Sequence, residues 1–390
     1  MPRLPILEWI KTYNQSKLSD DAVAAVIVTI MLIPQSLAYA MLVGLPPEVG
    51  LYASILPLVA YALFGSSMTL AVGPVAVVSL MTAAAISQVA TQGTPEYLGA
   101  AILLGLLSGV ILMGLGLARA GFLANLLSHP VISGFISASA ILIAFSQLKH
   151  VLGIPVNGHD LPGILVDLAT HIQETNGPTL IIGGLSIAFL FWVRSGLKPL
   201  LIRVGLSSEA ASTVSKAGPV MAVILSTAAV SLFALHQFGV SIVGVIPKGL
   251  PTPALPALDW TLARELLPAA FLISIVGFVE SVSVGHTLAA RRRERIQPNQ
   301  ELIGLGAANI ASGLGGGFPV TGGFSRSVVN FDAGARTPLA GVTTAVIIAL
   351  SGLFLRPLFE FLAKAVFADN VIVAVLSLVH LQAIHRGGVV

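Results

Sequence analysis

A glycine-rich break interrupts a strongly apolar stretch of this chain: residues 315–323 read GGGFPVTGG. Glycine costs about 1 kcal/mol and proline about 3 kcal/mol at an interior helix position, so a helix cannot continue through this stretch. A short helix can start again at about Ser325, with Arg326 in its first turn. The stretch therefore predicts a broken helix with a positive charge beside the break.

The composition around this break is that of a membrane protein. Of the 390 residues, 55% are hydrophobic and 9% are charged, and the mean hydropathy is +0.93. A soluble domain has about 25% charged residues, which excludes a cytosolic enzyme. The net charge of +3 is small and the basic residues are scattered, which excludes nucleic-acid binding as the main role. Cysteine is absent, and no nucleophile or metal-ligand pattern indicates an intramembrane enzyme.

Apolar runs that approach the length needed to cross about 30 Å of hydrocarbon predict about twelve helical segments. The runs are continuously apolar, without the period-two alternation of a membrane barrel. The predicted segments are residues 22–42, 49–65, 69–90, 97–118, 127–148, 179–195, 218–237, 268–290, 302–315, 325–335, 339–355 and 365–382.

Lysine and arginine in the loops predict a cytoplasmic N-terminus. With that orientation the outside segments hold five basic residues, and the inside segments hold the other fourteen apart from Arg326. Cytoplasmic loops carry the excess of Lys and Arg in membrane proteins. The five outside residues are Lys149, Lys248, Arg264, Arg356 and Lys364. The acidic loop 151–178 is then expected outside.

Glu280 and Arg326 are the charges that we interpret as lying at membrane depth. Such a charge costs at least about 2.5 kcal/mol and usually faces a partner or a cavity. Two hypotheses follow. The two residues form a structural ion pair with each other, or Arg326 belongs to an anion site and Glu280 is a titratable or cation-binding carboxylate near it.

A second break supports the anion site. Gly73-Pro74 interrupts the segment 69–90, and a helix can restart at about Val75. Two half-helices whose N-termini meet inside the membrane would direct free N–H groups and positive dipole ends at one point. Each half of the chain also has a polar kink ahead of its break, at Gln35 and at Glu280, which indicates an inverted repeat.

Several motifs, in order along residues 20–385, together resemble the sulfate permease (SulP) family of anion transporters. They are LIPQSLAYA at 32–40, LPP at 45–47, GLYAS at 50–54, VGP at 72–74, NQELI at 299–303 and GGFSRS at 322–327. The resemblance implies an all-α polytopic membrane protein with seven-plus-seven inverted repeats, whose core domain moves against a gate domain.

The resemblance divides the chain into domains, with the chain ending after about helix 12. We expect the last two gate helices and the regulatory (STAS) domain to be absent, and two departures, Val49 and Met68, weaken the family motif without touching the pocket. The expected parts are a cytoplasmic segment 1–21, core 22–120 (helices 1–4), gate 121–240 (helices 5–7), an extracellular connection 241–267, core 268–355 (helices 8–11) and partial gate 356–390 (helix 12).

The family's anion pocket maps onto seven residues of this sequence. They are Gln35, Tyr39, Val75, Ala76, Phe324, Ser325 and Arg326. Glu280 falls where ion-coupled members carry an acidic residue, so the resemblance implies a coupling ion, H⁺ or Na⁺, and no cofactor and no metal other than that possible sodium.

The predicted function is secondary active transport or exchange of a small anion such as sulfate, bicarbonate, chloride or a dicarboxylate. The alternatives are a nucleobase transporter of the same fold, against which Arg326 argues, and a passive anion channel or non-transporting fragment. The expected location is the cell inner membrane, the partners are the anion and the lipid bilayer, and a homodimer is a further possibility.

Overall fold

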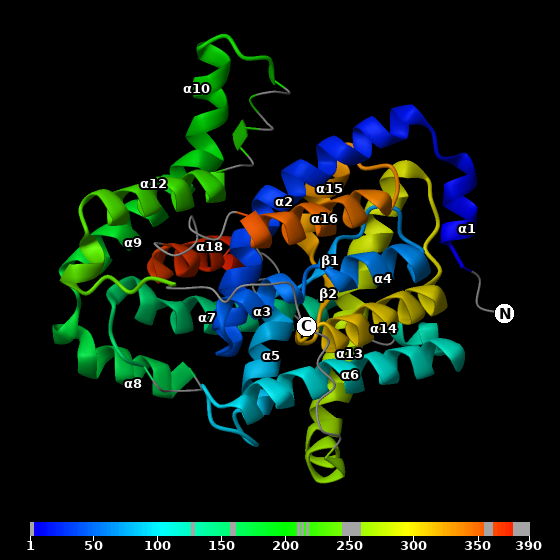
Figure 1. Cartoon of the computed structure of the whole chain (residues 1–390), viewed down its shortest axis with the longest axis horizontal. Coiled ribbons are helices and arrows are strands. Elements are labelled where there is room, and N and C mark those ends of the chain that lie inside the picture. The colour runs from blue at the N-terminus through cyan, green and yellow to red at the C-terminus, as the bar shows by residue number, and fades with distance from the viewer. Residues whose placement is uncertain are drawn as a thin grey trace, which may run out of the picture. The chain divides into compact units, whose positions relative to one another are not determined.

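The structure is a computed structural model, and it describes residues 4–125, 129–156, 161–208, 211, 214–215, 218–243, 259–354 and 362–376. Helices make up most of this part of the chain (Figure 1). They form two compact units, each built from two separate stretches of sequence. Unit 1 comprises Met1–Ser128 and Lys248–Phe354, and unit 2 comprises His129–Pro247 and Leu355–Val390.

Unit 1 contains both helix breaks and a two-stranded antiparallel sheet. Its elements are α1 (Ile6–Trp9), η1 (Ile10–Thr12), α2 (Gln15–Val43), α3 (Pro47–Tyr52), α4 (Leu56–Phe64), β1 (Val72–Gly73), α5 (Ala76–Ile86), α6 (Pro95–Leu117), η2 (Ala120–Asn125), α13 (Trp260–Arg292), α14 (Pro298–Leu314), β2 (Thr321–Gly322), α15 (Phe324–Asp332) and α16 (Leu339–Phe354).

Unit 2 is assembled around α18, which packs against α7, α9 and α12. Its elements are α7 (His129–Leu152), α8 (Leu161–His171), η3 (Ile172–Glu174), α9 (Gly177–Trp192), η4 (Val193–Leu197), α10 (Lys198–Arg203), α12 (Gly218–Leu232), η5 (Leu235–Phe238) and α18 (Lys364–Leu376). An antiparallel bridge between Ile242 and Ala363 joins its two stretches of sequence.

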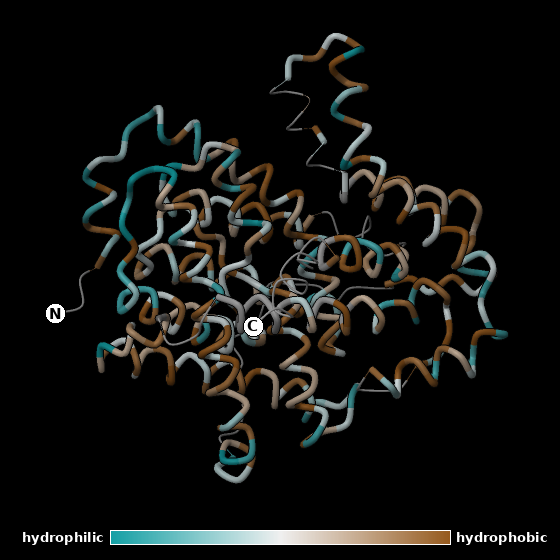
Figure 2. The backbone as a smooth tube through the Cα atoms, turned by 180° about the vertical axis from the view of Figure 1, so that it is seen from behind, coloured by the Kyte–Doolittle hydropathy of each residue, from teal (hydrophilic) through white to brown (hydrophobic). Residues whose placement is uncertain are grey.

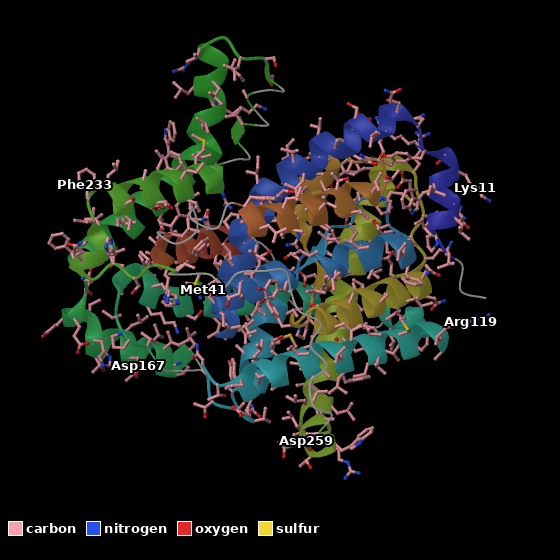
Figure 3. The ribbon with its side chains drawn as sticks, in the orientation of Figure 1. Lys11, Met41, Arg119, Asp167, Phe233 and Asp259 are labelled. Atoms are coloured by element: carbon pink, nitrogen blue, oxygen red, sulfur yellow. The ribbon has the colours of Figure 1, made fainter. Side chains whose placement is uncertain are left out.

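Local sequence explains where the long helices begin and end. Asn14 caps α2 by accepting a hydrogen bond from the Lys17 N–H, and Thr94 caps α6 in the same way. Such side chains satisfy N–H groups that have no intrahelical acceptor. Asp259 caps α13 and lies exposed at its start (Figure 3). Helix α2 ends at Gly44, whose φ of 89° is the left-handed conformation that glycine adopts readily.

Glycines allow α6 and α14 to approach backbone to backbone. A methyl group added at Gly306 would lie 2.8 Å from the backbone nitrogen of Met113, and one added at Gly109 would lie 2.7 Å from that of Ile310. Small residues permit this close packing between membrane helices. The GxxxG pair of α6, Gly105 and Gly109, therefore serves packing within unit 1.

The predicted breaks are confirmed, and several predicted boundaries are wrong. Helices α5 and α15 begin at Ala76 and Phe324, next to the expected starts. The predicted segment 49–65 corresponds to a stretch of membrane-spanning length, Pro47–Phe64, which is divided into two helices, α3 and α4. The loop 151–178 contains α8, and α13 begins at Trp260 instead of 268. These ends are amphipathic or polar, so a search for apolar runs excludes them.

Hydropathy follows the helices, with hydrophilic residues in the N-terminal segment and in several connecting turns (Figure 2). Among the described residues, five helical stretches are long and apolar enough to cross a membrane, and two of these stretches combine successive short helices. They are Gln15–Val43, Pro47–Phe64, Pro95–Leu117, Gly177–Arg203 and Trp260–Arg292. The shorter α5 and α15 are the half-helices that follow the breaks.

Candidate functional site

The two helix breaks are joined by backbone pairing. Strand β1 pairs with β2 so that Val72 lies opposite Gly322 and Gly73 lies opposite Thr321. Helix α5 begins three residues after β1, and α15 begins two residues after β2. The short sheet therefore brings together the N-termini of two helices from opposite ends of the sequence.

Both helix N-termini keep free N–H groups. The caps, Val75 and Gly323, provide no side-chain acceptor, and the first intrahelical bonds run from the Ser79 N–H to Val75 O and from the Ser327 N–H to Gly323 O. The N–H groups at positions 76–78 and 324–326 thus have no partner among the described residues. Such N–H groups and the positive end of the helix dipole favour an anion.

Arg326 links the two breaks and keeps one nitrogen unused. Its side chain is buried, its Nε donates to Ala71 O at 3.3 Å, and its Nη1 donates to Pro74 O at 3.2 Å. The buried Nη2 has no hydrogen-bond partner in the part of the chain that the structure describes. Methyl groups added at Gly73 and Gly323 would lie 3.3 Å and 3.0 Å from Nη2, so glycine at both positions makes room for the guanidinium.

Glu280 lies near Arg326 but is not paired with it. The two side chains and Tyr39 are close enough to interact electrostatically. Among the described residues, however, Arg336 and Asp20 form a salt bridge, and Glu280 and Arg326 do not. The Oε2 atom of Glu280 is buried, and no described residue forms a hydrogen bond with it. The hypothesis of a structural ion pair is therefore wrong.

The other predicted pocket residues differ in burial. Tyr39, Val75 and Ala76 are buried beside Arg326, at the contacts of α2 with α5 and α15. Gln35 is half-buried on α2, and its side chain has no hydrogen bond to a described residue. Phe324, 45% exposed, and Ser325 lie at the open side of the α15 N-terminus. The structure thus gathers a buried group around Arg326 and leaves these two residues at its edge.

Hydroxyl and amide side chains fix the backbone at the two breaks. Ser281 of α13 contacts Thr321 through their hydroxyls at 2.6 Å and accepts from the Gly322 N–H at 2.8 Å. Ser327 accepts from the Ala71 N–H at 2.9 Å, and Asn330 donates to Thr69 O at 3.0 Å. Ser327 and Asn330 were not predicted as supporting residues. The sequence does contain a signal for them, because both residues follow Arg326 within one short polar helix.

A buried carboxylate stabilises the loop that leads into β1. Glu301, within the family motif but without a predicted role, accepts from the Tyr61 hydroxyl at 2.8 Å. It also accepts from the Ser66 N–H and hydroxyl and from the Ser67 N–H, at 2.6–2.9 Å. Backbone N–H donors of this kind stabilise the charged form of a carboxylate. Glu301 thereby holds the start of α14 against the end of α4.

The sequence interpretation overlooked two acidic residues inside predicted segments. Asp332 is the last residue of α15, and Asp369 lies in the middle of α18 with 0% exposure. Both residues therefore belong beside Glu280 and Arg326 in the set of charged residues within predicted segments, with Asp332 exposed and Asp369 buried. Among the described residues, no three His, Asp or Glu side chains gather as a metal site requires.

Comparison with known proteins identifies this arrangement. The model of the sulfate permease family matches residues 18–387. The chain belongs to the sulfate permease family. It is 40% identical over 377 residues to the chloroplastic sulfate transporter 4.1 of Arabidopsis thaliana, and the aligned region covers 96% of this chain and 53% of that protein. A probable sulfate transporter of Mycobacterium tuberculosis is 35% identical over 376 residues, covering 96% and 64%.

Solved structures of anion transporters share the fold. Murine Slc26a9, an anion transporter in the inward-facing state, has a TM-score of 0.88 at 24% identity, covering 99% of this chain and 65% of that one. The transmembrane domain of the cyanobacterial bicarbonate transporter BicA has a TM-score of 0.82 at 22% identity, covering 95% and 91%. The predicted helical inverted-repeat fold is thus confirmed. The chain spans just over half the length of the first Arabidopsis relatives.

Proposed function

We propose that this member of the sulfate permease family is a secondary transporter of a small anion, with sulfate as the first candidate. The observation that carries the proposal is the meeting of two uncapped helix N-termini at the guanidinium of Arg326. The names of its relatives, sulfate and bicarbonate transporters, give the same substrate class. Such a site offers backbone donors and one fixed positive charge, which suits an oxyanion.

Each predicted pocket residue has a physical role in this proposal. Arg326 supplies the charge, and the N–H groups of α5 and α15 supply hydrogen bonds. Gln35 and Ser325 add side-chain donors, because neither is buried and both lie on helices that contact one another. The apolar side chains exclude water, which strengthens each remaining electrostatic contact. They are Tyr39, Val75, Ala76 and Phe324.

Glu280 is the proposed coupling residue. Its Oε2 is buried without a hydrogen-bond partner from the described residues, on a helix that packs against α15. A proton or a sodium ion bound there would neutralise the carboxylate, so that ion binding and anion binding at Arg326 influence each other. In the accompanying transport cycle, the core residues of unit 1 move against the gate residues of unit 2. The proposed location is the cell inner membrane, with the N-terminus in the cytoplasm, and a homodimer is part of the same proposal.

Uptake into proteoliposomes tests this proposal. Labelled sulfate, bicarbonate and fumarate are offered with and without inward proton and sodium gradients, to the chain as given and to Arg326→Ala. We expect saturable uptake of one anion, driven by one gradient and reduced at least about 100-fold by the substitution, the loss expected for a buried charged contact worth about 3 kcal/mol. The matched control is Arg295→Ala, which removes an exposed arginine from the loop after α13.

Other outcomes contradict parts of the proposal. Unchanged uptake by Arg326→Ala would exclude the anion site at the two helix N-termini. Anion flux that is independent of both gradients, with no accumulation beyond the equilibrium distribution, would indicate a passive channel. Full gradient-driven accumulation by Glu280→Gln would remove the coupling role from Glu280 and leave the anion site standing.

A further inference from the structure

Helix α18 of unit 2 carries two adjacent polar side chains in an otherwise apolar and buried stretch. Asp369 is 0% exposed and Asn370 is 7% exposed. Both carboxylate oxygens of Asp369, and both the amide oxygen and the nitrogen of Asn370, are buried without a hydrogen-bond partner among the described residues. Buried side-chain polar atoms are nearly always hydrogen-bonded, so four unpartnered atoms at one level of a helix require an explanation.

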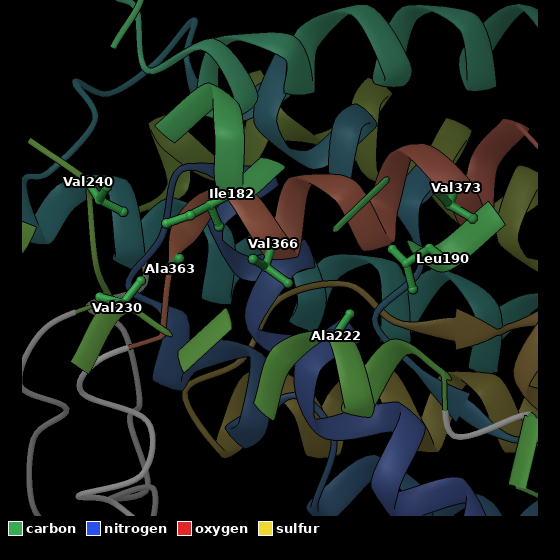
Figure 4. Packing of buried hydrophobic residues seen from close by; sticks show 8 residues of the cluster. All are labelled: Ile182, Leu190, Ala222, Val230, Val240, Ala363, Val366 and Val373. Carbon is green, nitrogen blue, oxygen red and sulfur yellow. The ribbon is translucent and has the colours of Figure 1, made fainter. Parts of the chain in front are cut away.

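The surroundings of this pair are apolar on the faces that the structure describes. On the side of α7, Ala368 and Ile372 pack with Val151. On the side of α9 and α12, Val366 and Val373 belong to a cluster that includes Ile182, Leu190 and Ala222 (Figure 4). Asn370 shares this second face, because it lies four residues after Val366 and three before Val373. Asp369 lies between the two apolar faces.

Charged groups on the neighbouring elements do not reach Asp369. Helices α9 and α12 contain no titratable residue, and the described side chains of α7 offer Lys149 and His150 at its C-terminal end. Arg194 of η4 donates to Val373 O at 2.8 Å, and Lys364 begins α18 itself. In the part of the chain that the structure describes, none of these groups forms a hydrogen bond or an ion pair with the carboxyl of Asp369.

An isolated carboxylate cannot remain charged in such a place at reasonable cost. Burial of an unpaired ionised carboxylate is so unfavourable that the group is neutralised instead. A bound metal ion would need several oxygen ligands. Asp369 and Asn370 are successive residues whose side chains diverge by about 100° around the helix, and no third acidic or histidine side chain joins them among the described residues. A proton is therefore favoured over a metal cation.

We propose that Asp369 is a proton-binding site of unit 2, additional to Glu280 of unit 1. The carboxyl group holds its proton while α18 is packed against α7 and α9, and releases it when the middle of α18 becomes accessible to water. Proton release is thereby linked to the packing of α18. The proposal does not depend on anion transport, since it concerns the protonation of one side chain in the folded protein.

Infrared spectroscopy of the full chain in lipid nanodiscs tests the proposal directly. The carboxylic-acid C=O stretching band is recorded from mildly acidic to alkaline pH, in sodium-free buffer, for the wild type, Asp369→Asn, Glu280→Gln and the exposed control Glu174→Gln. We expect a band that persists above neutral pH in the wild type, Glu280→Gln and Glu174→Gln and is lost in Asp369→Asn. Asp369→Glu should restore it at a shifted frequency.

Three results would overturn the proposal. The first is an infrared spectrum of Asp369→Asn that equals the wild-type spectrum, when the variant elutes as a folded protein. Asp369 would then be ionised at neutral pH in the wild type. The second is loss of the wild-type band on adding sodium at constant pH, which would make the site a sodium site. The third concerns the free energy of unfolding. Because unfolding releases the proton, this free energy should fall more steeply with rising pH in the wild type than in Asp369→Asn. Equal slopes of the free energy of unfolding against pH would contradict proton binding.

Discussion

At the scale of single residues, Glu301 shows how a buried carboxylate can stabilise a loop. Its carboxylate accepts from Tyr61, Ser66 and Ser67, and every one of these donors lies at the end of α4 or in the loop before β1. Breaking such a set leaves buried N–H groups without acceptors, which costs their full desolvation. Glu301 therefore determines how the chain enters β1 and reaches the first half-helix.

We predict that Glu301→Gln destabilises the protein by about 2–3 kcal/mol, because the amide NH₂ replaces one acceptor and faces donors. Tyr61→Phe, which removes one of the hydroxyl donors, should cost about 1 kcal/mol. Thermal unfolding in detergent measures both. Equal unfolding temperatures for Glu301→Gln and the wild type would show that the carboxylate does not hold this loop.

The sequence predicted part of the site at this scale. Arg326 and Glu280 could be found because a charge in an apolar run is conspicuous. Whether their side chains form an ion pair could not be predicted, because pairing depends on how each helix is rotated about its axis. The sequence does not determine that rotation. Asp369 was missed among apolar neighbours near the end of the chain. Glu301 was recognised only as part of a motif, since a carboxylate beside a helix start usually indicates a solvated first turn.

At the scale of elements, the glycine contact between α6 and α14 sets the spacing of unit 1. The atoms that meet there are backbone atoms, which cannot rotate away as a side chain can. We predict that Gly306→Ala destabilises the protein by about 1–3 kcal/mol through overpacking. Gly114→Ala is the matched control, because it lies on α6 and a methyl group there meets nothing within 4 Å.

The control should be neutral or up to about 1 kcal/mol more stable, since alanine favours a helix over glycine. Thermal unfolding of the two variants in one detergent gives the comparison. The close-contact interpretation fails if Gly306→Ala and Gly114→Ala shift the unfolding temperature in the same direction by similar amounts.

The half-helix α15 is held at its far end by Arg292 of α13. The guanidinium donates to Ala335 O at 2.5 Å and to Phe331 O at 3.4 Å, and it lies 4.3 Å from the centre of the Phe331 ring. A cation at a helix C-terminus stabilises the helix dipole. A helix of nine residues is marginal on its own, so it depends on contacts of this kind at both of its ends.

We predict that Arg292→Ala destabilises the protein by about 1 kcal/mol, the usual value for a partly exposed dipole and cation–π contact. Arg292→Lys should recover only part of this loss, because lysine lacks the planar fork. Hydrogen exchange of α15 amides measures the effect locally, with Arg295→Ala as control. Unchanged exchange of α15 in Arg292→Ala would contradict the role of this arginine.

Elements were predicted best where the sequence contains a physical interruption. Gly73-Pro74 and the glycines at 315–323 each exclude a helix, and the structure has breaks at both. The pairing of β1 with β2 could not be derived, because two-residue strands have no recognisable pattern. Helix α8 was missed because it has 11 residues, and the apolar run 164–166 inside it is far too short to cross a membrane.

At the scale of the whole molecule, the distribution of lysine and arginine predicts a cytoplasmic N-terminus. The absence of cysteine from the sequence allows a direct test, since a single introduced cysteine is the only thiol. Lys11 and Glu174 are exposed and lie in segments expected on opposite sides (Figure 3 labels Lys11). Lys11→Cys should react with a membrane-impermeant maleimide only after the cells are opened. Glu174→Cys should react with the same reagent in intact cells. The reverse labelling pattern would show that the N-terminus lies outside the cell.

The pairing of Val72 with Gly322 also has a consequence for biogenesis. When β1 leaves the ribosome, its partner strand has not been translated, and the first half-helix enters the membrane beside a break whose backbone groups lack their final acceptors. Unsatisfied backbone groups are costly in lipid. The early chain must therefore wait near the insertion machinery or in a watery vestibule until residue 322 emerges. Its assembly is completed late, and synthesis that stalls before that residue leaves a chain that cellular quality control can recognise.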